Sequence, residues 1–104
     1  MLKNEVINVL EKRINTNDND SYTVYKYRDK LVGLLGKDAG ETIKILYELN
    51  EKEVLYISEV FEEIAEALQS CDYIECLWKL AEKFPKSNLE RCVETAEKFM
   101  DEKC

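Results

Sequence analysis

Four glutamates in the middle of the chain, Glu59, Glu62, Glu63 and Glu66, have the side chains and the spacing that could support chemistry. In a helix they would lie within about two turns of one another. Paired carboxylates can act as general acid and base, but only in a pocket that moves their pKa values apart. The chain contains no histidine, and neither a lysine nucleophile nor a glycine-rich loop accompanies the glutamates. We therefore predict that the protein is not an enzyme and that these carboxylates form a binding surface.

The cysteines give no sign of a metal centre. Cys71, Cys76, Cys92 and Cys104 are spaced neither as CxxC nor in combination with histidine. Zinc would need all four thiolates, and their separations match no common structural site. We predict no metal and no cofactor. Cys71, Cys76 and Cys92 are expected to be core or half-buried thiols, which fits a reduced compartment and hence a cytoplasmic protein.

Two polar segments share features with ligand-binding loops but lack their essential residues. The Asp- and Asn-rich stretch 15–21 has no turn glycine and no later bidentate glutamate, so a calcium loop of the EF-hand type is not expected. Segment 36–42 has two glycines, but Glu41 follows the second one where a phosphate-binding loop needs lysine. A polar connector is the prediction for the first stretch, and a helix start for the second.

The charge balance limits the choice of partners. Twenty-two acidic residues against fifteen basic ones give a formal charge of −7, which repels nucleic acid phosphates and anionic lipid alike. No apolar run is long enough to span a membrane, and the first residues do not resemble a signal peptide. We predict no nucleic acid and no membrane partner. A basic protein partner is favoured, with solubility alone as the other explanation of the charge.

Apolar residues recur at helical spacing along almost the whole chain. Residues 22–27 also alternate as a strand would, but a single short strand would have no partner in this chain, so we predict a helix there. Gly36 is expected to end that helix, and Asp38 with Glu41 to form a capping box for the next. Pro85, the only proline, should end another helix. The predicted helices are 2–15, 22–35, 38–50, 51–69, 72–84 and 88–100.

One domain covering residues 1–104 is expected, because the chain is too short for two independent cores. The fold class is all-α, a compact array of about five to six antiparallel helices joined by short links. A short curved helical-hairpin superhelix is the alternative arrangement. Ser70 or Asp72 should cap the fifth helix, and Ser87 or Asn88 the last. The aromatic residues expected in the core are Phe61, Trp78, Phe84 and Phe99, while some tyrosines must reach the surface.

The block VFEEIAEALQS at residues 60–70, followed by Tyr73-Ile74 and by Lys83-Phe84-Pro85, resembles small helical bacterial immunity proteins. These proteins are encoded beside polymorphic or contact-dependent growth-inhibition toxins. The resemblance extends over roughly residues 24–100 and rests largely on fold-forming residues. It implies a protein that binds its cognate toxin domain in the cytosol and inhibits it stoichiometrically, with no catalytic residues. Many such toxins are nucleases with basic substrate clefts, which an acidic helical face could occupy.

The predicted function is therefore that of an immunity protein, whose partner is the C-terminal domain of a basic toxin. Electrostatic steering would speed the encounter and a few desolvated aromatic residues would hold the complex. Two other functions are considered, a homo-oligomeric structural role and an acidic helical adaptor or regulatory subunit of an unrelated cytosolic complex. In the adaptor case the acidic surface is only solvated or pairs internally with Lys79, Lys83 and Lys86. The partner-binding residues predicted are Glu59, Glu62, Glu63, Glu66, Asp72 and Glu75.

Overall fold

The chain folds as an all-α array, as predicted, in a computed structural model that describes residues 1–102 and 104. Residues 22–27 are helical, and the described residues include no β-strand. If the interrupted segment α4–η1–α5 is taken as one helix, this part of the chain has six α-helices, within the expected number. The elements are α1 (Leu2–Ile14), α2 (Ser21–Leu35), α3 (Ala39–Glu48), α4 (Glu51–Ile57), the 3-10 helix η1 (Ser58–Val60), α5 (Phe61–Leu68), α6 (Cys71–Lys83), the 3-10 helix η2 (Pro85–Ser87) and α7 (Glu90–Glu97).

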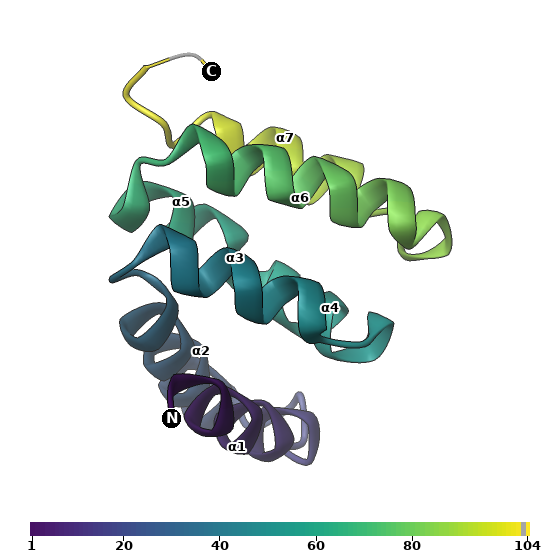
Figure 1. Cartoon of the computed structure of the whole chain (residues 1–104). Coiled ribbons are helices and arrows are strands. Elements are labelled where there is room, and N and C mark those ends of the chain that lie inside the picture. Colours follow the sequence, from purple (N-terminus) through teal and green to yellow (C-terminus); the bar gives the residue numbers. More distant parts are fainter. Residues whose placement is uncertain (103) are drawn as a thin grey trace.

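Two helical hairpins lie on opposite sides of a middle layer (Figure 1). The α1–α2 hairpin forms one end of the molecule and the α6–α7 hairpin the other. Between them lie α3 and the α4–η1–α5 segment, with α1 against α4, α3 against α6 and α5 against α7. The radius of gyration is 12.8 Å, close to the value of about 13 Å for a compact chain of this length. In the described part of the chain, no helix is both long and apolar enough to cross a membrane.

Side-chain caps fix where the middle helices begin. Asp38 accepts a hydrogen bond from the backbone N–H of Glu41 at 3.0 Å, so it caps α3 as predicted. The reciprocal bond of a full capping box occurs instead at the start of α4. There Asn50 accepts from the N–H of Glu53 at 2.8 Å, and the Glu53 carboxylate accepts from the N–H of Asn50 at 2.9 Å. These caps satisfy backbone donors that the first helical turn leaves free.

The first helix of the α6–α7 hairpin has the predicted N-terminal cap, but the second helix does not. Ser70 caps α6, and α6 ends just before Pro85. Asn88 was expected, with Ser87, as a candidate cap for α7. It instead adopts the left-handed conformation at φ 52° and ends η2, so this prediction is wrong. Asparagine tolerates the left-handed region because its short side chain can bond the local backbone.

The predicted helix over residues 51–69 is interrupted by η1, which is a correction to the sequence analysis. Val60 departs from helical geometry, with φ −123° and ψ 15°. The Ser58 hydroxyl donates to a backbone carbonyl one turn earlier. Arg28 Nη2 donates to the carbonyl of Glu59 at 2.7 Å, which is the acceptor that a continuous helix would offer to the N–H four residues ahead. Contacts from the α1–α2 hairpin therefore replace helical bonds at this point.

The core centres on Phe61 and Tyr73, the largest fully buried side chains. The Tyr73 hydroxyl donates to the carbonyl of Phe61 at 3.0 Å, and burial raises the pKa of Tyr73 well above its ordinary value, so it remains a donor. The core position of Phe61 is thus confirmed, while Trp78 and Phe84 pack half-buried against the core. Phe99 is 40% exposed. Its predicted core position is wrong because α7 ends before it.

The cysteines divide into a disulfide pair and two thiols. Cys76 is buried and Cys92 half-buried, as predicted, and burial raises the pKa of the Cys76 thiol to about 11. Cys71 was also expected to be a core or half-buried thiol. It is instead exposed at the start of α6 and is bonded to Cys104, with 5.4 Å between the Cα atoms. Disulfides persist mainly in oxidising compartments, so this pair does not follow the expectation of a reduced environment.

The segment after α7 returns to the start of α6 because Gln69 holds it there. Gln69 ends α5 in the left-handed conformation, with φ 47°. Its side chain donates to the carbonyl of Phe99 at 2.9 Å and accepts from the backbone N–H of Asp101 at 2.8 Å. These bonds bring the segment toward Cys71 without the help of a disulfide. No local pattern indicates this return, since 33 positions separate the two bonded cysteines.

We expect loss of the disulfide to lower stability without changing the fold. Cross-linking residues across this separation stabilises through the unfolded chain by about 2–4 kcal/mol, and we expect the low end because Gln69 already restrains the segment. The measurement is urea denaturation of the oxidised protein and of Cys104→Ser. Reductant should lower the midpoint of the wild type and leave that of the variant unchanged. An identical midpoint for oxidised and reduced wild type would contradict the expectation.

Candidate functional site

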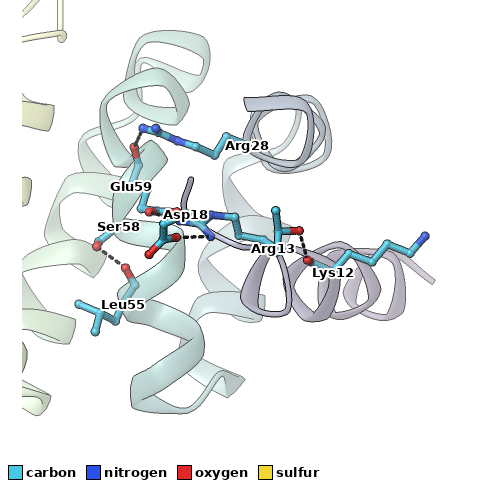
Figure 2. A network of polar contacts seen from close by, with 8 residues as sticks. Lys12, Arg13, Asp18, Arg28, Leu55, Ser58 and Glu59 are labelled. Carbon is cyan, nitrogen blue, oxygen red and sulfur yellow. Dashed lines mark hydrogen bonds and ion pairs between the residues drawn. The ribbon is translucent and has the colours of Figure 1, made fainter. Parts of the chain in front are cut away.

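Glu59 lies in a polar network with Arg13 rather than on a free acidic surface (Figure 2). Arg13 Nε and Nη2 donate to the two carboxylate oxygens of Glu59 at 2.9 and 2.7 Å, and Nη1 donates to Asp18 at 3.2 Å. Arg13 is 4% exposed, and its guanidinium carbon lies 5.1 Å from the centroid of the Tyr56 ring. The hydrogen bond with Glu59 raises the pKa of Arg13 against the opposing effect of burial. The carboxylate of Glu59 is thus engaged within the molecule.

Arg28 joins the same network from α2 and connects it to an exposed aromatic residue. Besides donating to the Glu59 carbonyl, its guanidinium carbon lies 5.4 Å from the centroid of the Tyr25 ring. A shallow recess of about 320 Å³ opens here, with Tyr25, Asp18 and Val24 among its lining residues. The network therefore fixes the position of η1 and the side of α2 that faces it.

The other three glutamates predicted in this segment project from α5. Glu63 and Glu66 are exposed and Glu62 is half-buried. None of the ion pairs in the described part of the chain includes them. Partial burial raises the pKa of Glu63, the negative charge of Glu62 raises it further, and Arg28 opposes the rise. The structure therefore keeps these like charges together without an internal counterion in contact.

Asp72 and Glu75 belong to another helix than this cluster. Both are exposed on α6, and Glu75 pairs with Lys79 of the same helix at 3.2 Å. Glu75 and Lys79 lie near Tyr47 of α3, whereas Glu63 lies near charges of α2. Of the six predicted residues, Glu59 is thus engaged in the internal network, Glu75 is paired on α6, and Glu62, Glu63, Glu66 and Asp72 take part in no ion pair of the described residues.

Sequence reasoning did not identify the exposed aromatic residues of α2, the helix whose Arg28 and Asp29 lie near Glu63. Tyr22 and Tyr25 are 82% and 59% exposed on α2. Together with Asp29 they follow helical spacing, on the side opposite the buried Val24 and Leu31. This pattern was available in the sequence once a helix was assigned there. The α5 glutamates and these two tyrosines are called the α2–α5 face below.

Arg13 was also missed, although the sequence carried a signal for it. It continues the apolar stripe of Val6 and Leu10 at helical spacing, and these are the buried residues of α1. A cation on an apolar stripe is almost never fully buried without a partner. The pattern therefore indicates a buried ion pair, but the identity of Glu59 as its partner depends on the packing of distant helices.

Comparison with known proteins finds no matching family model, no matching curated protein and no matching solved structure. What this surface does must therefore follow from its geometry and charge.

We expect Arg13→Ala to destabilise the protein by about 3 kcal/mol, because it leaves the Glu59 carboxylate without its bidentate partner. Glu59→Ala should cost a similar amount, and the double variant should cost less than the sum of the two. Urea denaturation of the wild type and the three variants measures this coupling. Additive losses would show that the pair makes no specific contribution.

Replacement of Glu63 by glutamine should raise stability at neutral pH. The raised pKa means that the folded state holds this proton more tightly than the unfolded chain, so stability falls as pH rises through the folded-state pKa. Glu63→Gln removes that dependence and leaves stability equal to wild type well below about pH 4, where both states are protonated. Denaturation midpoints measured across the acid range check this. Glu90→Gln on α7 is the control for loss of one negative charge. If it raised the denaturation midpoint as much as Glu63→Gln does, the gain could not be attributed to the surroundings of Glu63.

Proposed function

We propose that the chain is an immunity protein that binds the C-terminal domain of a basic toxin and inhibits it in one-to-one stoichiometry. The observation that carries this proposal is the α2–α5 face: α5 carries three carboxylates that take part in no ion pair of the described residues, and the contacting helix α2 carries two exposed tyrosines. Tyrosine is enriched in protein interfaces because its ring is apolar and its hydroxyl remains available for hydrogen bonds.

The charge distribution along the chain supports a basic partner. Residues 1–52 carry nine acidic and nine basic side chains, whereas residues 53–104 carry thirteen acidic and six basic ones. The whole net charge of −7 therefore belongs to the part of the chain that contains α5, α6 and α7. A field of this kind speeds association with a positively charged cleft.

The local electrostatics support the same partner. The pKa of Glu63 is raised partly by its neighbour Glu62, so a cation placed against α5 would relieve an unfavourable interaction. The tyrosines on α2 would then supply the desolvated contacts that slow dissociation. In the proposed cytosolic setting, thiol-reducing systems would keep Cys71 and Cys104 reduced. The Gln69 bonds would still hold the last segment in place.

The test uses the C-terminal domain of the protein encoded immediately upstream in the source genome. We expect a one-to-one complex and restored growth of cells that express this domain. Glu62→Lys with Glu66→Lys should lower the association rate at least about 10-fold at low salt. Tyr22→Ala with Tyr25→Ala should mainly raise the dissociation rate.

The matched control is Asp72→Lys with Glu75→Lys, which makes the same change in net charge on α6. A similar loss of association rate in this control would assign steering to the overall charge rather than to the α2–α5 face. Absence of binding to the upstream domain would overturn the immunity function. Binding without protection of the cells would instead favour the adaptor function.

A further inference from the structure

The hairpin of α1 and α2 forms one end of the molecule (Figure 1). A groove with three lysines among its lining residues lies between these two helices. Its volume is about 440 Å³. Val9 and Leu34, both half-buried, provide apolar surface. Gly33 has no side chain to fill the space, and a Cβ added there would meet no atom within 4 Å. The remaining lining residues are Glu5, Asn8, Lys12, Lys30 and Lys37.

The cations of this groove are available to a ligand. Lys12, Lys30 and Lys37 are all exposed, and none of them takes part in the ion pairs of the described chain. Glu5 is the one carboxylate among the residues that line the groove. Three lysines around an apolar floor complement an acidic helix better than a basic or neutral one.

The α5 helix has the matching chemistry. Glu62 and Glu66 are one turn apart, about 6 Å along the helix, and Glu63 lies beside them. In the groove, Lys30 and Lys37 are seven residues apart, a wider spacing than that of the two glutamates. Lysine side chains are long and flexible enough to reach both carboxylates. The groove and the α5 glutamates are distinct surfaces, because the groove is lined by residues 5–12 and 30–37 with none from α5, whereas α5 approaches α2 with Ala67 next to Gly36.

We propose that α5 of one copy of this chain docks into the α1–α2 groove of a second copy. The two contact surfaces differ, so the contact is head-to-tail and can continue into short open chains or close into a ring. The net charge of −7 opposes the encounter, but salt screens charges beyond about 8 Å at physiological ionic strength while pairs in contact persist. The association is therefore weak, with a Kd on the order of 0.1–1 mM.

This contact does not depend on the identity of the toxin, but it uses the same α5 glutamates as the proposed immunity function. A partner bound to α5 and a second copy bound to α5 exclude one another. Binding of a tighter partner would therefore dissolve the chains, and self-association would cover the acidic face while no partner is present.

Sedimentation velocity of the purified chain tests the proposal at concentrations on the order of 0.1–1 mM. The average mass of the wild type should rise with concentration at moderate salt and return to that of the monomer in about 1 M salt. Lys30→Glu with Lys37→Glu should abolish association by removing the groove cations, and Glu62→Lys with Glu66→Lys should abolish it by removing the anions. Circular dichroism confirms that each variant is folded.

A mixture of the two charge-reversed proteins gives the sharper result. The groove is intact in one variant and α5 is intact in the other, and the two reversed surfaces also have opposite charges, so the mixture should associate although neither protein associates alone. Lys83→Glu with Lys86→Glu, outside the groove, makes the same change in net charge as the groove variant and should associate as the wild type does. A monomeric wild type, a mixture that fails to associate, or equal loss in the control would each overturn the proposal and leave toxin binding untouched.

Discussion

The arrangement of the helices depends on one bidentate ion pair, in which Arg13 at the end of α1 holds the carboxylate of Glu59 in η1. The guanidinium is almost fully buried, and a buried cation is tolerated only where its donors are satisfied. Glu59 satisfies two donors and Asp18 a third. This requirement ties the first hairpin to the middle layer and fixes the point at which α4 gives way to α5. Arg28 also donates to the backbone carbonyl of Glu59. The α1–α2 hairpin therefore holds Glu59 of η1 by both the carboxylate and the backbone.

The same pair determines what remains available on the surface. It withdraws Glu59 from the acidic cluster and leaves Glu62, Glu63 and Glu66 on a short helix that begins in a new direction. Arg28, held by η1, lies against Tyr25 and also lies near Glu63. Interfaces commonly combine aromatic anchors with a charged rim. The surface proposed for partner binding is thus a by-product of how the protein buries one arginine.

The α1–α2 hairpin has two sides with opposite electrostatic character. One side meets η1 and α5 and borders carboxylates, and the other is the groove with Lys12, Lys30 and Lys37. Residues 1–52 are neutral overall. The net charge of this part of the chain therefore does not show that the hairpin has an acidic side and a basic side. A chain with complementary patches on different surfaces can bind copies of itself even though its net charge is repulsive. Salt weakens the long-range repulsion between two copies more than it weakens ion pairs in contact.

Most helices could be predicted from the chain alone, because apolar spacing and local caps act within a few residues. These patterns predicted a helix over residues 22–27, a cap at Asp38 and a break before Pro85, and they identified Phe61 as core. Features that depend on residues distant in the chain could not be predicted from it: the interruption at Ser58 to Val60 and the pairing of Glu59 with Arg13. The disulfide of Cys71 belongs to this group too, because Gln69 brings the last segment to it across 33 positions. Local patterns specify which face of a helix is buried, but which charge meets which is set by the packing of whole helices.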